Sequence, residues 1–116
     1  MARDRVWHDG ERAAWEVYRR RGFRLVARNW RSPLGELDLV VERDGLVAFC
    51  EVKARSSSRL GGGHEAVTAS KQRKVRALAE AFIAARGGPE RYRFDVASVR
   101  VRPDGRADVH LFEDAF

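Results

Sequence analysis

The dipeptide Asp44-Gly45 constrains the fold of this chain more than any other feature. It separates two runs of strand-forming residues, 36–42 and 46–55, in the first of which apolar and polar residues largely alternate. Asp-Gly between such runs favours a two-residue type I′ hairpin turn, because both residues tolerate a positive φ. The sequence therefore predicts two neighbouring antiparallel strands with a fixed register.

This register places acidic and basic side chains opposite one another. Paired residues have numbers that sum to 89, as 44 and 45 do, so Asp38 faces Glu51 and Glu36 faces Lys53. All four side chains share one face, because strand side chains repeat every second residue. Directly opposed Cβ atoms lie about 5 Å apart. Two carboxylates at that distance repel by roughly 3 kcal/mol at an effective dielectric constant near 20.

Three arrangements would relieve the repulsion: a shared proton, the ammonium group of Lys53, or a divalent cation. Mg²⁺ satisfies this chemistry best, because it binds one or two carboxylates together with water and phosphate oxygens. It also polarises phosphorus and lowers the pKa of a bound water. Lys53 would then orient the attacking water or stabilise the pentavalent phosphate. The structural alternative is a cross-strand salt-bridge cluster on a solvated sheet face.

The other periodicities predict two helices and three more strands. The first helix spans 7–21, and the second is capped by Thr68 or Ser70 and packs through Val75, Leu78, Ala79 and Phe82. The further strands lie at 23–31, 92–102 and 107–112, and 55–63 is expected to be a mobile loop able to close over a ligand. Val99 and Val101 fall in register with Asp95, which requires a bulge or burial on both faces. The order α-β-β-β-α-β-β predicts one domain over 1–116, an α/β fold with a mixed sheet flanked by helices.

Glu11 belongs to the inward stripe of the first predicted helix, because it follows Trp7 by four residues and precedes Ala14 by three. A carboxylate directed at the core needs a partner. A functional role is one interpretation. The other is a first-turn carboxylate favoured by the helix dipole, or a partner for a nearby Arg.

The charge of the chain predicts a polyanionic partner. Its 116 residues include 23 Lys and Arg against 17 Asp and Glu, a net charge of +6. Basic groups that neutralise phosphates release counterions, so DNA is the natural partner; a basic solvated exterior is the alternative. The candidate phosphate contacts are Arg28, Arg31, Arg55, Lys71, Arg73 and Lys74.

Composition excludes several other classes of protein. The single cysteine, Cys50, allows no intramolecular disulfide and is expected in the core, facing away from Asp38. The histidines, among them His64, show no metal-ligand spacing. No run of 18 apolar residues and no signal-peptide h-region is present. We therefore expect a cytoplasmic protein without a membrane partner.

The ordered motifs resemble the YraN-type family of predicted endonucleases. This family lies within the PD-(D/E)xK superfamily, which shares a restriction-endonuclease-like fold. The resemblance rests on Gly10-Glu11, Arg28-Asn29-Trp30-Arg31, Gly35-Glu36-Leu37-Asp38-Leu39, Phe49-Cys50-Glu51-Val52-Lys53-Ala54-Arg55, Glu65-Ala66-Val67, Lys71-Gln72-Arg73 and Arg93-Phe94-Asp95-Val96. Leu37 stands where the motif name has proline, a position that varies in the superfamily.

The resemblance implies a role for several residues. Asp38 and Glu51 would be metal ligands and Lys53 the catalytic lysine. Glu11 matches a first-helix glutamate that completes the site in the similar archaeal Holliday-junction resolvases. Gln72 matches a polar position often found near such sites, although a helix-start role is the simpler interpretation. For Glu36 the hairpin register, and not the resemblance, suggests a salt bridge that holds Lys53.

The expected function is Mg²⁺- or Mn²⁺-dependent hydrolysis of DNA phosphodiester bonds, on branched, damaged or single-stranded DNA. Symmetrical cutting of a junction would require a homodimer, which this chain length allows. Two alternatives keep the fold without the reaction. One is a nucleic-acid-binding module, and the other is a protein-interaction domain.

Overall fold

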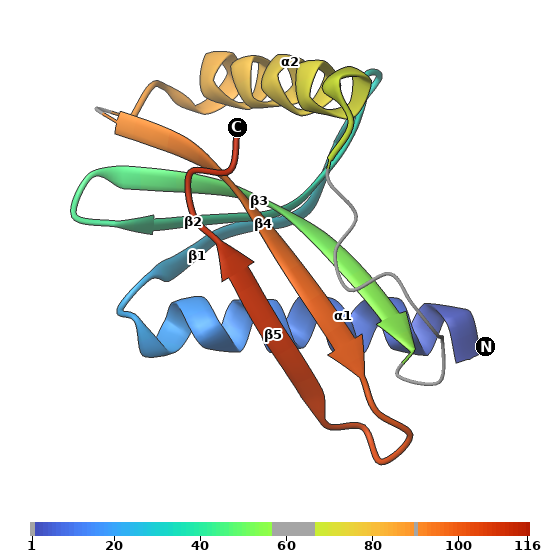
Figure 1. Ribbon diagram of the computed structural model, residues 1–116. Helices are drawn as coiled ribbons and strands as arrows, with labels where there is room; N and C mark the ends of the chain where they lie inside the picture. The colour runs from blue at the N-terminus through green and yellow to red at the C-terminus, as the bar shows by residue number, and fades with distance from the viewer. Residues whose placement is uncertain (1, 57–66, 90) are drawn as a thin grey trace.

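Five strands form one mixed sheet in the computed structural model of the protein (Figure 1), in the order β1-β2-β3-β4-β5. Residues 2–56, 67–89 and 91–116 are described, residues 2–5 by their backbone alone. The elements are α1 (Ala2–Arg20), β1 (Arg24–Ser32), β2 (Gly35–Arg43), β3 (Leu46–Ser56), α2 (Ala69–Arg86), β4 (Arg91–Val101) and β5 (Ala107–Phe112). Strands β3 and β4 are parallel, and the other neighbouring pairs are antiparallel. The predicted element order and mixed sheet are confirmed, and they are consistent with a restriction-endonuclease-like fold.

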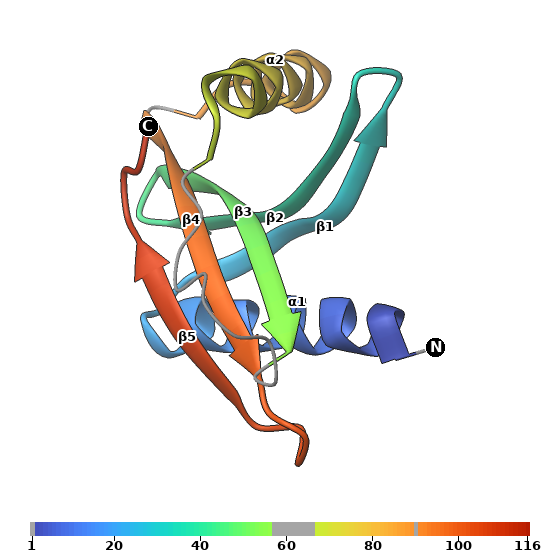
Figure 2. The same cartoon turned by 45° about the vertical axis from the view of Figure 1, so that its right-hand side comes forward.

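The two helices cover opposite faces of the sheet (Figure 2). On one face, Ala14 and Tyr18 of α1 pack against Leu39, Cys50 and Val52. Burial of Cys50 on this face confirms the expected core role. On the other face, α2 buries the four predicted residues, Val75, Leu78, Ala79 and Phe82. No described helix is long and apolar enough to cross a membrane.

The helix ends differ in how closely the sequence predicts them. Thr68 caps α2, and its Oγ1 accepts a hydrogen bond from the Lys71 N–H at 3.1 Å. Gly87, with φ of 90°, ends that helix. Helix α1 instead begins at Ala2, before the predicted start at Trp7. The apolar periodicity could not detect this first part, because its residues are mostly charged. Of the predicted loop, Arg55 and Ser56 continue β3, and residues 57–63 lie outside the described residues.

The middle of strand β4, residues 94–97, is buried on both faces, without a bulge. Its parallel register with β3 is unbroken from Arg91 to Val101. Asp95, Ala97, Val99 and Val101 face the α1 side, whereas Phe94 packs with α2. Burial on both faces therefore explains the position of Val99 and Val101.

The hairpin register is confirmed near its turn but ends before the acidic residues. Pairing continues with numbers summing to 89 from Arg43–Leu46 to Leu39–Cys50, and the turn residues have φ of 50° and 80°. The Val52 N–H, which that register would pair with Leu37, instead donates to Asp38 Oδ2 at 2.8 Å. Strands β2 and β3 therefore separate at this point.

This separation corrects both predicted pairs of charged residues, because Asp38 is not paired with Glu51 in the ladder either. Glu36 does not lie opposite Lys53, because the last β2–β3 pair, Leu39–Cys50, comes three pairs earlier. Glu36 is instead paired with Arg31 of β1, whose Nε donates to its Oε2 at 3.1 Å. Leu37 and Val40 both pack in the α2-side core, although strict alternation would place them on opposite faces. Strand β2 therefore turns about its axis near Asp38.

A buried hydrogen bond fixes α1 against the sheet. The Tyr18 hydroxyl donates to Asp95 Oδ2 at 2.6 Å, and both side chains are fully buried. Asp95 also accepts from Arg93 Nε at 3.0 Å and from the Asp114 N–H at 2.9 Å. Glu11 precedes Tyr18 by about two helical turns. The network therefore fixes the helix that carries Glu11.

Gly10 allows α1 to approach β3 closely. A Cβ atom built on Gly10 would lie 2.4 Å from the Cβ of Ala54. The contact involves a short, partly buried side chain that cannot swing away. The absence of a side chain at position 10 therefore determines how deeply the next residue, Glu11, enters the fold.

We expect Gly10→Ala to lower the free energy of unfolding by about 1–3 kcal/mol, because overpacking forces a backbone shift. Denaturant titration measures this change. Gly88→Ala, whose Cβ would come no closer than 3.5 Å to Ile83, is the matched control. Ala54→Gly should restore much of the loss in the Gly10→Ala background. Equal losses with and without Ala54→Gly would contradict the steric explanation.

Candidate metal centre

An open cavity of about 490 Å³ lies where α1, β1, β2, β3 and the start of α2 meet. Its walls are mostly polar and carry both signs of charge. The lining residues are Trp7, His8, Asn29, Arg31, Glu36, Asp38, Glu51, Lys71, Lys74 and Leu78. Fully buried Glu11 lies behind this cavity, because its carboxylate reaches those of two lining residues.

The Glu11 carboxylate is only half satisfied by its neighbours. Its Oε1 accepts from Asn29 Nδ2 at 3.2 Å and lies 3.6 Å from Arg28 Nη2. Its Oε2 is buried and has no hydrogen-bond partner among the described residues. A buried carboxylate oxygen without a partner is costly, so a ligand that binds this oxygen would stabilise the site.

Three carboxylates converge at this point. Glu11, Glu36 and Asp38 each offer one oxygen, and these oxygens all lie within 4.8 Å of one another. Hard oxygen donors from several carboxylates suit Mg²⁺ and Mn²⁺. The cluster, together with the unpartnered Glu11 Oε2, therefore fits a divalent cation.

The pKa of Asp38 is raised to about 8. Burial is the largest cause, and the negative charge of Glu51 is the second. The hydrogen bond from the Val52 N–H lowers the pKa, the charge of Glu11 raises it, and Lys71 lowers it. Without a cation, ionisation of Asp38 is therefore disfavoured.

Glu51 has its own counterion in the cavity. Lys71 Nζ, at the start of α2, lies 3.1 Å from Glu51 Oε1, and the Glu51 side chain is 7% exposed. Sequence reasoning placed Lys71 among the phosphate contacts and assigned the central ammonium to Lys53. Lys53 lies on the Glu51 face of β3 but does not line the cavity, and it forms no ion pair with a described residue.

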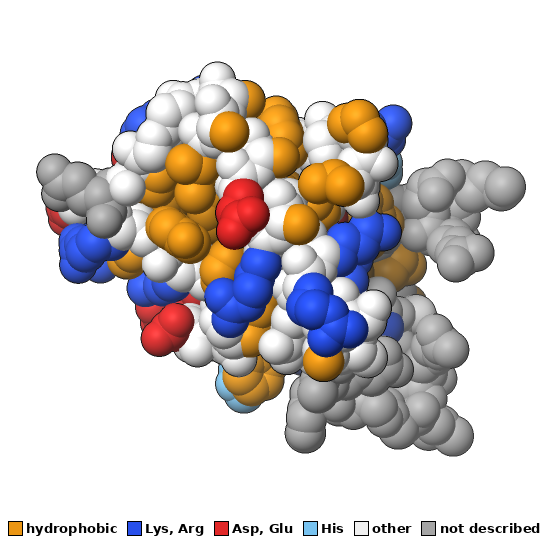
Figure 3. All heavy atoms as spheres, turned by 90° about the horizontal axis from the view of Figure 1, so that it is seen from above, with side chains coloured by type: hydrophobic (Ala, Val, Ile, Leu, Met, Phe, Trp, Pro, Cys, Tyr) orange, Lys and Arg blue, Asp and Glu red, His pale blue; other side chains and the backbone are white. Residues whose placement is uncertain are grey.

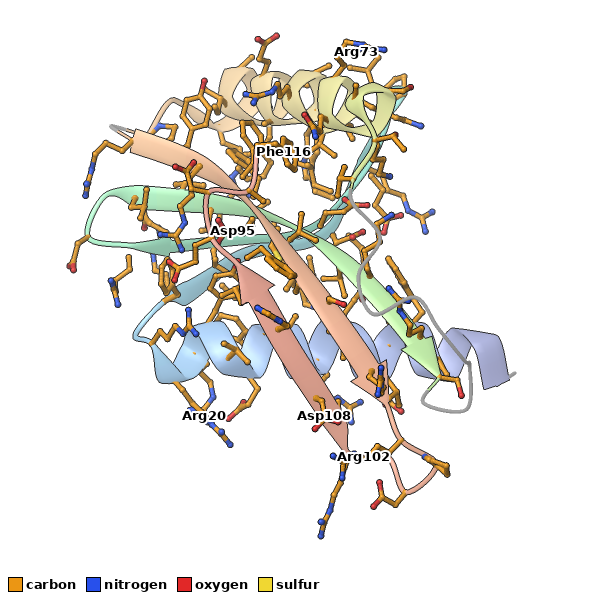
Figure 4. The ribbon with its side chains drawn as sticks, in the orientation of Figure 1. Arg20, Arg73, Asp95, Arg102, Asp108 and Phe116 are labelled. Carbon is orange, nitrogen blue, oxygen red and sulfur yellow. The ribbon has the colours of Figure 1, made fainter. Side chains whose placement is uncertain are left out.

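The remaining predicted residues fall into two groups. Arg28, Arg31 and Lys74 lie at the cavity, although Arg31 is paired with Glu36. Gln72 and Arg73 do not line it. The Gln72 amide donates to the Val67 carbonyl at 2.9 Å, a role in the helix start, and Arg73 lies on the outward side of α2 (Figure 4). Arg55 lies further along β3, and His64 is outside the described residues.

Sequence reasoning missed Asn29 as a site residue and gave Glu36 the wrong neighbour. Asn29 adopts a left-handed φ of 49°, and its Oδ1 is also buried without a described partner. The only local signal is that Asn tolerates this conformation better than most residues. Glu36 reaches the site because β2 turns, which strand alternation alone does not predict.

Comparison with known proteins identifies relatives that match this chain over most of its length. The model of the "Uncharacterised protein family UPF0102" matches residues 10–99. A UPF0102 protein of Symbiobacterium thermophilum is 44% identical over 97% of this chain and 96% of its own. UPF0102 proteins of Nocardia farcinica and Caldicellulosiruptor saccharolyticus are 43% and 33% identical, over 92% and 100% of this chain and 85% and 100% of their own.

Metal-free protein should lose stability as the pH rises through the range set by Asp38. The pKa of Asp38 in the folded protein, about 8, exceeds the ordinary value of 3.8. The folded state therefore binds more protons than the unfolded state between these pH values, and the loss of stability is complete above pH 8. Asp38→Asn should therefore raise the free energy of unfolding in EDTA at pH 9 and have little effect below pH 4.

The measurement is denaturant titration across this pH range, with Asp104→Asn as the control at an exposed carboxylate. An Asp38→Asn effect of the same size at both ends of the range would contradict the raised pKa.

Proposed function

We propose that this chain, which belongs to the UPF0102 family, the YraN-type family, is a metal-dependent nuclease that hydrolyses DNA phosphodiester bonds. The convergence of Glu11, Glu36 and Asp38 carries this proposal. Their oxygens lie within 4.8 Å of one another, at a cavity open to solvent, and one buried oxygen has no described partner.

Glu11, Glu36 and Asp38 would hold Mg²⁺ or Mn²⁺, with Glu51 as a further ligand once Lys71 is displaced or shared. The ion supplies Lewis-acid activation of the phosphorus centre and a water of lowered pKa. Folded protein without metal keeps these oxygens close together despite their repulsion, so little reorganisation is needed on binding.

The basic residues around the carboxylates would bind the DNA backbone. Arg28 and Lys74 lie at the site, and the surface on the α2 side shows more basic than acidic side chains (Figure 3). Lys71, 3.1 Å from Glu51, is the ammonium best placed to face a phosphate in the cavity. Lys53 lies two residues beyond Glu51 on β3, about 6.6 Å along the strand at a rise of about 3.3 Å per residue. It would stabilise negative charge on the phosphate from that side. Phosphate contacts of this kind position DNA without reading its sequence.

Isothermal titration with Mn²⁺ tests the metal site without requiring turnover. We expect saturable binding to the wild-type protein and a loss of affinity of at least about tenfold in Glu11→Gln, because the unpartnered oxygen is then no longer anionic. Asp104→Asn, which removes an exposed carboxylate, serves as the control. Wild-type affinity in Glu11→Gln would contradict the assigned ligand set.

Cleavage assays test the reaction itself. With Mn²⁺, the protein should cut at least one of supercoiled, single-stranded and four-way-junction DNA. Asp38→Ala should lower the rate about 100-fold or more, since a metal supplies several kcal/mol of transition-state stabilisation. Activity that persists in Asp38→Ala or in EDTA would contradict the metal mechanism. Salt-sensitive DNA binding with no Mn²⁺-dependent cleavage would instead favour the binding-module alternative.

The same assay separates the two lysines. Lys71→Met should lower cleavage more strongly than Lys53→Met, because Lys71 alone contacts a cavity carboxylate. Both variants remove one charge and keep a long apolar side chain. A larger loss in Lys53→Met would show that the lysine of the family motif, and not Lys71, acts in the reaction.

A further inference from the structure

We propose that the sheet face beyond Glu51 binds a single-stranded DNA segment that leads into the cavity, an inference that rests on the proposed nuclease function. We call this surface the open sheet face. It is formed by side chains of β3, β4 and β5 that point to the α2 side. Its residues are Lys53, Arg55, Ser98, Arg100, His110 and Phe112.

The register of the sheet places these residues in rows that begin at the candidate site. The β3–β4 and β4–β5 pairings align Glu51, Val96 and Phe112 across the three strands. The next row is Lys53, Ser98 and His110, and the one after it is Arg55, Arg100 and Asp108. At about 3.3 Å per residue, Arg55 lies about 13 Å from Glu51 along the strand.

Helix α2 does not cover this part of the sheet. It lies over the other end, whereas no described helix crosses β5 on this side (Figures 1 and 2). Arg100 and His110 are exposed on this face. Their chain neighbours Val99 and Val109 point the opposite way and pack on the α1 side. A shallow cavity of about 180 Å³ lies between Arg55, Arg100 and His110.

The basic side chains here lack counterions within the described structure. Arg55 and Arg100 occupy directly paired positions, and like charges in such positions repel. The nearest acidic position in their row is Asp108, whose carboxylate is bound by Arg102 at 2.9–3.1 Å (Figure 4). Neither Arg55 nor Arg100 forms an ion pair with a described residue. A phosphate bound between the two guanidinium groups would relieve this repulsion.

An aromatic pair lies beside these cations. The His110 and Phe112 rings are stacked, with centroids 4.2 Å apart and planes 13° from parallel. Unpaired bases stack on such flat surfaces while basic groups follow the backbone. A duplex keeps its bases stacked inside and would use only the cations. The combination therefore favours a single strand over a duplex.

Fluorescence anisotropy in EDTA, with labelled oligo(dT) and a duplex of equal length, tests binding separately from cleavage. We expect wild-type protein to prefer the single strand. Arg55→Gln/Arg100→Gln should raise Kd for the single strand about tenfold and reduce the slope of log K against log salt by about 1.4, for two lost phosphate contacts. His110→Ala should raise Kd about fivefold or more, with the salt slope unchanged.

The control is Arg12→Gln/Arg20→Gln, which removes the same charge from α1 on the opposite face and should leave Kd within about twofold of wild type. Melting temperatures identify any variant that is misfolded, and His110→Ala provides a second, uncharged test. Equal affinity for duplex and single strand, or wild-type affinity in both test variants, would overturn the proposal. Because EDTA removes metal, failure of the nuclease proposal would appear only as absent cleavage and would leave these affinities unchanged.

Discussion

The hydrogen bond from the Val52 N–H to the Asp38 carboxylate determines how the sheet opens to form a site. At 2.8 Å it replaces the next bond of the β2–β3 ladder, so the two strands part after Leu39 and Cys50. Beyond that point β2 turns, and Glu36 comes within reach of Glu11. The Asp38 side chain thus ends the hairpin pairing and is itself a candidate ligand. It also allows a second candidate ligand, Glu36, to approach a third, Glu11.

Burial and charge oppose each other throughout this site. Glu11, Asp38 and Glu51 are all buried, yet the contacting cations, Arg28 and Lys71, are partly solvent-exposed. The fold tolerates this because other interactions fix α1 in place. The Tyr18–Asp95 bond anchors its C-terminal half, and Gly10 lets its N-terminal half approach β3. A site strained by its own carboxylates is typical of a centre that a cation completes.

Much of the fold could be predicted from the sequence because it depends on local rules. The Asp44-Gly45 turn fixed the hairpin, and the apolar stripe of α2 identified all four of its buried residues. Part of the site followed from the same register, since Asp38 and Glu51 do line one cavity. The pairing of Glu36 with Lys53 was wrong, because a side chain, Asp38, replaced the backbone partner that the register assumed. The positions of Asn29 and Lys71 depend on packing between β1, α1 and α2, for which no sequence period exists.

The most direct test of the central claim is crystallography of the protein grown with Mn²⁺, using anomalous differences to locate the ion. The metal-centre assignment predicts a single strong anomalous peak in contact with carboxylate oxygens of Glu11 and Asp38, with Glu36 or Glu51 completing the protein ligands. A cavity in which Lys71 still contacts Glu51 and no anomalous peak lies beside Asp38, at a Mn²⁺ concentration that saturates binding in solution, would contradict it.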